Sequence, residues 1–129
     1  MYCLDSDIII EYFKGNTSIK NHFDKIHKSE LFITPITLCE LYKGAFLSKN
    51  VEKNIVIINK LLKTINIIEF DFYACELYGK IYSELKEKGK LTQDFDLIIA
   101  AICISNNKIL ITRNIKHFDK IKVLKIEKW

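Results

Sequence analysis

Three acidic residues are spaced so that one fold could bring them to a single site. Asp5 follows the short apolar run 2–4. Glu40 lies in the segment TLCELYKG, and Asp96 precedes the apolar segment 97–104. Carboxylates that gather repel one another and raise one another's pKa unless a cation lies among them. Oxygen ligands suit Mg²⁺ or Mn²⁺ better than zinc, so these acids raise the hypothesis of a metal ion that activates water.

Each acid also has a simpler structural explanation. Asp5 could form a turn, and Glu40 could complete a capping box that Thr37 begins. Asp96 could interact with the dipole at a helix N-terminus. The three acids form a site only if the fold brings them together. The helices and strands that carry them therefore decide between a shared site and three local roles.

The apolar segment 97–104 is the element that must hold Asp96. Eight consecutive apolar residues fit either a buried strand or a buried helix. Ala100 and Ala101 favour a helix, because alanine is the best helix former and a poor strand residue. A helix without a polar face must lie inside the fold. We therefore predict a buried helix with Asp94 and Asp96 at its N-terminus, where Asp94 points elsewhere and only caps the helix.

Short β-like runs alternate with helical segments along the rest of the chain, which predicts a parallel sheet covered by helices on both faces. The predicted strands are 2–4, 31–34, 66–70, 109–112 and 123–126. The predicted helices include 8–13, capped by Ser6 or Asp7, then 16–28, one that starts at Thr37, 51–63 and 72–88, which Asp71 caps.

The predicted topology brings the three acids to one edge of the sheet. Right-handed crossovers gather the carboxyl ends of parallel strands, where Asp5 and Glu40 follow the first and second strands. The helix of Asp96 runs antiparallel to the fourth strand, so its N-terminus lies at that strand's carboxyl end.

Composition limits the class of protein. A chain of 129 residues with 49% hydrophobic residues is predicted to form one domain, residues 1–129, with a substantial core. No apolar run approaches the roughly 20 residues of a membrane span, and no signal peptide is visible. The scattered Cys3, Cys39, Cys75 and Cys103 lack zinc-site spacing and are interpreted as reduced core thiols of a cytoplasmic protein.

A basic region follows the buried segment. The formal net charge of +4 permits a polyanionic partner without requiring one. These cations would ordinarily form a solvated surface, but beside an acidic metal cleft they could hold a nucleic-acid backbone. They are Lys108, Arg113, Lys116, Lys120, Lys122 and Lys125.

Four segments in order carry a resemblance over nearly the whole chain: LDSD, TLCELYKG, DFDLIIAAICI and LITRNIKHF. Together they resemble the PIN-domain ribonucleases, and in particular the VapC-type toxins of bacterial toxin–antitoxin pairs. The resemblance implies a PIN-like three-layer α/β/α fold with a central parallel sheet of four to five strands. It also implies a metal-dependent endoribonuclease that cleaves RNA, transfer RNA among the candidates, forms a homodimer and is silenced by a cognate antitoxin.

The same resemblance assigns roles to residues. It implies that Asp5, Glu40 and Asp96 are catalytic and bind Mg²⁺ or Mn²⁺, with Ser6, Asp94, Thr112 and Asn114 in support. The family pattern Asp-Thr-Asn corresponds to Asp5-Ser6-Asp7, which keeps the hydroxyl and adds a charge. Many members carry an acid where Asn114 stands, so a second metal site would be weaker here or completed by the substrate.

Two other classes compete with this interpretation. A phospho-receiver domain needs an acceptor aspartate after the third strand, but Asp71 there lies at a helix cap, and too many helices separate the first and third strands. A catalytically silent PIN-like module that binds RNA or protein would not need the three acids, and their retention argues against it.

Overall fold

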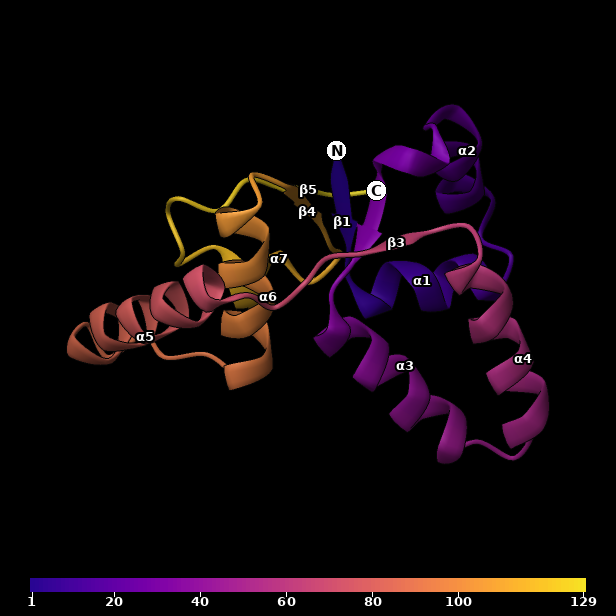
Figure 1. Ribbon diagram of the computed structural model, residues 1–129, viewed down its shortest axis with the longest axis horizontal. Coiled ribbons are helices and arrows are strands. Elements are labelled where there is room, and N and C mark those ends of the chain that lie inside the picture. Colours follow the sequence, from indigo (N-terminus) through magenta and orange to yellow (C-terminus); the bar gives the residue numbers. More distant parts are fainter.

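A five-stranded, wholly parallel sheet lies at the centre of the computed structural model, which describes residues 1–129 (Figure 1). The strands lie in the order β3-β2-β1-β4-β5. Their bounds are β1 Tyr2–Leu4, β2 Leu31–Ile33, β3 Asn66–Ile67, β4 Ile109–Ile111 and β5 Ile126–Glu127. The predicted α/β class and parallel sheet are therefore confirmed, with the first strand at the centre.

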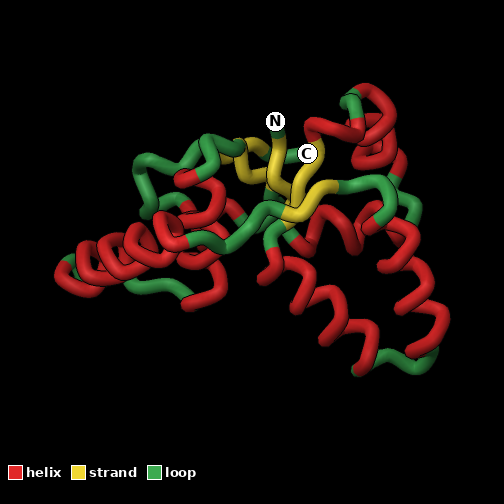
Figure 2. The backbone as a smooth tube through the Cα atoms, in the orientation of Figure 1, coloured by secondary structure: helices red, strands yellow, loops and turns green.

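Helices cover both faces of the sheet (Figure 2). One side carries α1 Ser6–Phe13, α2 Thr17–Lys25, α3 Pro35–Phe46 and α4 Val51–Leu62. The other carries α5 Phe72–Glu87, α6 Asp94–Ser105 and the short α7 Ile115–Phe118. A 3₁₀ turn, η1 Lys28–Glu30, leads into β2. None of these helices combines the length and the apolar character that crossing a membrane requires.

Alternate residues of the central strands divide the interior into two cores. Cys3 of β1 and Leu110 of β4 belong to the core under α5 and α6. Their neighbours Leu4 and Ile111 belong to the core under α1, α3 and α4. Successive side chains of a strand point to opposite faces, so strands of only three residues are enough to supply both cores.

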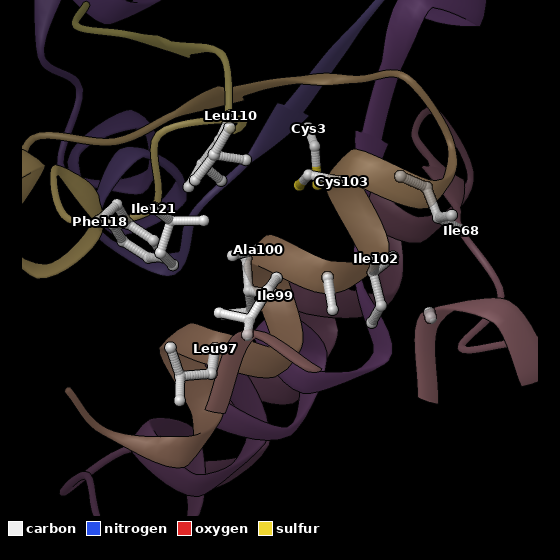
Figure 3. Packing of buried hydrophobic residues seen from close by; sticks show 14 of the residues in the cluster. Cys3, Ile68, Leu97, Ile99, Ala100, Ile102, Cys103, Leu110, Phe118 and Ile121 are labelled. Atoms are coloured by element: carbon white, nitrogen blue, oxygen red, sulfur yellow. The ribbon is translucent and has the colours of Figure 1, made fainter. Parts of the chain in front are cut away.

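The predicted buried helix is α6. Its residues Leu97 and 99–103 are fully buried, and it packs against α5. Figure 3 shows its side chains gathered with Leu110 and Phe118, and Cys103 beside Cys3. An apolar helix in this position has no face left for water, which explains why its sequence shows no amphipathic period.

Several predicted boundaries are wrong. The helix α3 starts at Pro35 and not at Thr37, because Thr34 caps it by accepting the Thr37 N–H at 3.0 Å. The predicted strand 123–126 is mostly a turn: the Leu124 N–H binds the Ile121 carbonyl, and β5 forms only at its end. Cys39 and Cys75 are exposed and are not core thiols.

We predict that α6 dominates stability. Replacing Ile102 by alanine should lower the free energy of unfolding by about 2–5 kcal/mol, because it leaves a cavity in a fully buried site. Val56 on α4 is half exposed, so Val56→Ala should cost no more than about 0.5 kcal/mol. Urea unfolding of both variants measures the difference. Equal costs would contradict the buried position of α6.

Candidate functional site

Asp5 is the centre of a buried polar cluster at the carboxyl edge of the sheet. It follows β1 directly, and its N–H extends the ladder to the Ile111 carbonyl of β4 at 2.9 Å. Its side chain is only 7% exposed. One carboxylate oxygen accepts the Ser6 N–H and the other accepts the Thr112 hydroxyl, both at 2.8 Å. Asp5 is thus the N-cap of α1, a role that the sequence assigned to Ser6 or Asp7.

Asp7 is a second acid of this cluster, which the sequence suggested only as a candidate helix cap and as a charged replacement for asparagine. One of its oxygens accepts the Arg113 N–H at 2.9 Å, and the Thr112 hydroxyl lies 3.5 Å from the same atom. Its other oxygen is buried and has no hydrogen-bond partner. The sequence could have indicated this role, because Asp7 lies in the first turn of a helix that starts at the edge of the sheet where the other acids gather.

Glu40 reaches the site from α3. Since that helix begins at Pro35, Glu40 lies in its second turn and cannot complete a capping box with Thr37. The side chain is half-buried, and its Oε2 atom is buried without a hydrogen-bond partner. The local explanation of Glu40 as a capping residue therefore fails.

Asp96 approaches from the first turn of α6 and is also nearly buried. One of its oxygens lies 2.9 Å from Nδ1 of His117, on α7. The same imidazole nitrogen lies 2.9 Å from the side-chain nitrogen of Asn114, whose backbone N–H binds the Thr112 hydroxyl at 3.0 Å. Sequence reasoning missed His117. Its only signal was a histidine three residues after Asn114.

Two supporting residues differ in their placement. Burial raises the pKa of the Glu40 carboxyl, and the nearby Ser6 hydroxyl offsets part of that rise. Asp94 is exposed, and it accepts a hydrogen bond of 3.0 Å from the Tyr78 hydroxyl of α5. It bonds to α5 and not to the cluster, as its spacing predicted, but it does not cap α6, whose N-cap is Gln93.

Burial raises the pKa of all four carboxyls in the cluster. Desolvation is the largest cause for Asp5, whose pKa rises to about 6 although the Thr112 hydrogen bond partly offsets it. Desolvation likewise raises the pKa of Asp7, Glu40 and Asp96. Like charges add to this, since Asp7 and Glu40 raise the pKa of Asp5. Such a cluster is unfavourable for four anions and favourable for a cation among them.

The donor atoms fit a hard divalent cation, although the side chains as they lie do not surround one point with three acidic or imidazole groups. The fit rests on the buried oxygens of Asp7 and Glu40 that lack any donor. Buried polar atoms without partners are costly, and carboxylate oxygens are the ligands that Mg²⁺ and Mn²⁺ accept. Asp5, Asp7, Glu40 and Asp96 are thus the residues that could hold the ion.

Comparisons with known proteins show which family has this fold. The PIN-domain family model matches residues 2–124. The chain belongs to the PIN-domain family. It is 35% identical to ribonuclease VapC1 of Haemophilus influenzae and 30% identical to the tRNA(fMet)-specific endonuclease VapC of Shigella flexneri, and each alignment covers at least 97% of both chains. The crystal structure of VapBC2 from Rickettsia felis, bound to a promoter DNA fragment, superimposes with a TM-score of 0.93 at 33% identity, covering 99% of this chain and 98% of the other.

These matches confirm the resemblance to VapC ribonucleases and exclude a phospho-receiver domain. The PIN-like sheet with helices on both faces is the fold that the four sequence segments implied.

Two hollows flank the PIN-domain acids and meet at Ile10 and Lys14 of α1. The polar one, of about 540 Å³, is lined by Asp7, Glu11 and Asn114 and by the cations Lys14, Arg113 and Lys128. The more apolar one, of about 470 Å³, lies between α1, α3 and α4 and reaches Glu40.

The basic region predicted from the sequence does not form one surface. Arg113 follows β4 at the site and pairs with Glu11 at 3.0 Å. Lys108 precedes β4, where it lies over the ring of Phe32, and Lys125 precedes β5. These two lysines therefore lie at the opposite edge of the sheet from the acids.

We predict that Asp5 lowers stability as the pH rises. A carboxyl with a raised pKa binds its proton more tightly in the folded state, so its contribution is greatest below pH 3.8 and is lost as the pH rises through 6. At pH 7 the shift corresponds to about 3 kcal/mol at most. Asp5→Asn should therefore be more stable than the parent at pH 7 and nearly equal to it at pH 4.

Urea unfolding between pH 4 and 7.5, without divalent cations, measures this difference. Asp94→Asn is the matched control, since that exposed side chain lies outside the cluster, and it should follow the parent at every pH. An Asp5→Asn variant that is less stable than the parent at pH 7 would contradict the prediction.

Proposed function

We propose that this VapC-family ribonuclease is a metal-dependent endoribonuclease, in which Asp5, Glu40 and Asp96 bind Mg²⁺ or Mn²⁺ and Asp7 completes the anionic site. The observation that supports it is a group of four carboxyls with raised pKa at one sheet edge, two of which have buried oxygens without a partner. Perturbed carboxyls that converge in this way are typical of functional sites.

The proposed reaction is hydrolysis of an RNA phosphodiester. A bound divalent ion supplies a water of lowered pKa and offsets charge on the phosphate. Ser6 and Thr112 hold the Asp5 carboxylate in one orientation through two hydrogen bonds. The Arg113 N–H does the same for Asp7. Thr112 is fully buried and donates its hydroxyl hydrogen to Asp5, so it only positions that carboxylate. Asn114 is exposed and neutral, so it can orient a water or a phosphate oxygen but adds no charge.

The polar hollow is the proposed path of the RNA backbone. Its cations Lys14, Arg113 and Lys128 lie beside Asp7, so a strand bound there would pass the acids. Glu11 contacts both Lys14, at 3.2 Å, and Arg113, which keeps these two side chains at the rim of the hollow. The relative from Shigella flexneri is named a tRNA(fMet)-specific endonuclease, so transfer RNA is the first substrate to test, and action on it would place the protein in the cytoplasm.

The apolar hollow is the proposed seat of a cognate antitoxin. It is lined by Ile10, Leu41, Ile57 and Ile58, and Glu40 lies on its edge, so a segment bound there would lie beside the acids. The relative from Rickettsia felis was crystallised as VapBC2. A homodimer stays a prediction, for which the exposed Phe46, Leu47, Phe72 and Tyr73 are the candidate contacts.

The central prediction concerns the three proposed ligands. Asp5→Asn, Glu40→Gln and Asp96→Asn should each reduce RNA cleavage by about 100-fold or more, because each amide keeps the shape and removes the charge. Asp94→Asn, outside the cluster, should change it only slightly. Cleavage of a transfer RNA pool by the purified chain, with and without EDTA, measures both effects. Activity that survives the chelator would refute metal dependence, and so would full activity of Asp5→Asn and Asp96→Asn.

A second prediction concerns the polar hollow. In an Asp5→Asn background, which prevents cleavage, Lys128→Ala and Lys14→Ala should each weaken RNA binding and reduce the slope of log affinity against log salt by about 1. Lys80→Ala is the matched control, because this exposed lysine lies on α5, across the sheet (Figure 1). Fluorescence anisotropy of a labelled transfer RNA at several salt concentrations gives the slopes. Equal slopes for Lys128→Ala and Lys80→Ala would place the RNA elsewhere.

A further inference from the structure

Trp129 packs among aromatic rings that come from distant segments of the chain. Its indole stacks on the imidazole of His22 in α2, with ring centroids 4.8 Å apart and planes inclined by 7°. The ring of Phe23 meets the indole edge-on at 6.0 Å, and that of Tyr2 in β1 lies 5.8 Å away. The indole N–H donates to the Glu127 carboxylate at 3.2 Å. These contacts tie the segment after β5 to the first strand and to α2.

The backbone alone attaches the segment after β5 only weakly. β5 is an edge strand of two residues, Ile126–Glu127, and it pairs with β4 alone. The Thr112 N–H donates to the Glu127 carbonyl at 3.2 Å, and neither Lys128 nor Trp129 makes a backbone hydrogen bond. A segment with so few backbone bonds opens easily unless side chains hold it. The aromatic contacts of Trp129 therefore keep it in place.

Lys128 lies between these two attachments. The Glu127 carbonyl holds the backbone before it, and the side chain of Trp129 holds the backbone after it. Lys128 itself is exposed and lines the polar hollow with Lys14 and Arg113. A lysine on a fixed backbone loses less conformational freedom when it binds a phosphate than one on a mobile segment. The attachment of Trp129 thus affects how well Lys128 can bind.

We propose that Trp129 is a positioning residue for RNA binding, because its stacked indole holds Lys128 in the polar hollow. The inference rests on the proposed function, in which that hollow is the path of the RNA backbone. Trp129 carries no charge and acts through Lys128, by reducing the ordering that this lysine must undergo when a phosphate binds.

The alternative role of Trp129 is only to stabilise the fold, since it is half-buried and packs against the core under α1, α3 and α4. The two roles differ in their coupling to Lys128. A residue that acts through Lys128 has no further effect on RNA binding once Lys128 is removed. A residue that only stabilises the fold has the same effect with or without that lysine.

The experiment measures the binding of a labelled transfer RNA by fluorescence anisotropy, in the Asp5→Asn background that prevents cleavage. Trp129→Ala should weaken binding by about threefold to tenfold, which is the cost of ordering one lysine side chain. Trp129→Phe keeps an aromatic ring and should restore most of the affinity. The double variant with Trp129→Ala and Lys128→Ala should bind as Lys128→Ala alone does.

Tyr82→Ala is the matched control. Tyr82 is also a half-buried aromatic residue, with its ring 6.0 Å from that of Tyr78, but it lies on α5 across the sheet, so its loss should leave RNA binding unchanged. Thermal melting verifies that each variant folds. If Trp129→Ala does not fold, His22→Ala gives the same test, because it removes the stacked imidazole and no fully buried side chain. It should weaken binding only when Lys128 is present.

Amide hydrogen exchange tests the attachment without RNA. In Trp129→Ala the Thr112 N–H, which is bound to the Glu127 carbonyl, should exchange about tenfold faster than in the parent. The Ile68 N–H, bound to the Ile33 carbonyl at 2.9 Å near the other edge of the sheet, should exchange at the parent's rate. Trp129→Phe should keep both rates close to those of the parent.

Unchanged Thr112 exchange in Trp129→Ala overturns the inference. A loss of RNA binding that recurs in full in the Lys128→Ala background, or in Tyr82→Ala, overturns it as well. If Thr112 exchange rises but Lys128→Ala leaves RNA binding unchanged, the proposed RNA path is wrong and Trp129 has no role in binding. EDTA-sensitive cleavage of transfer RNA decides separately whether the proposed ribonuclease function stands.

Discussion

The hydrogen bond from the Thr112 hydroxyl to Asp5 connects the ends of the two central strands, and the arrangement of the site depends on it. Thr112 is fully buried after β4, and Asp5 follows β1. The same hydroxyl accepts the Asn114 N–H, and Asn114 contacts His117, which contacts Asp96. One chain of contacts thus joins the first strand to the buried helix α6, which explains how residues about 90 positions apart keep one geometry.

This arrangement is unfavourable for the apo protein. Four carboxyls with raised pKa gather where burial deprives them of water, and two of their oxygens have no donor. The free energy that stabilises the fold comes instead from the two apolar cores on the two faces of the sheet. A cluster that destabilises the fold in this way is expected where its carboxyls bind a ligand or take part in a reaction.

The helix α1 belongs to every part of the site. Asp5 caps it, Asp7 lies in its first turn, and Ile10 and Lys14 line both hollows. A partner that covers the apolar hollow would therefore lie one helical turn from the acids and beside the proposed path of RNA. In the proposed function, silencing by an antitoxin needs no long-range conformational change, because the two surfaces meet on the same helix.

Local patterns in the sequence determined much of this protein. The apolar octet around Ala100 favoured a buried helix, and the alternation of short strands with helices predicted a parallel sheet whose carboxyl edge gathers Asp5, Glu40 and Asp96. Tertiary structure decided the rest. The role of Asp7 depends on Arg113, 106 residues away, and that of His117 on Asp96, 21 residues away. The start of α3 and the separation of the basic residues likewise followed from packing and strand position. A pattern records the period of neighbouring residues, whereas these contacts arise only when distant segments fold together.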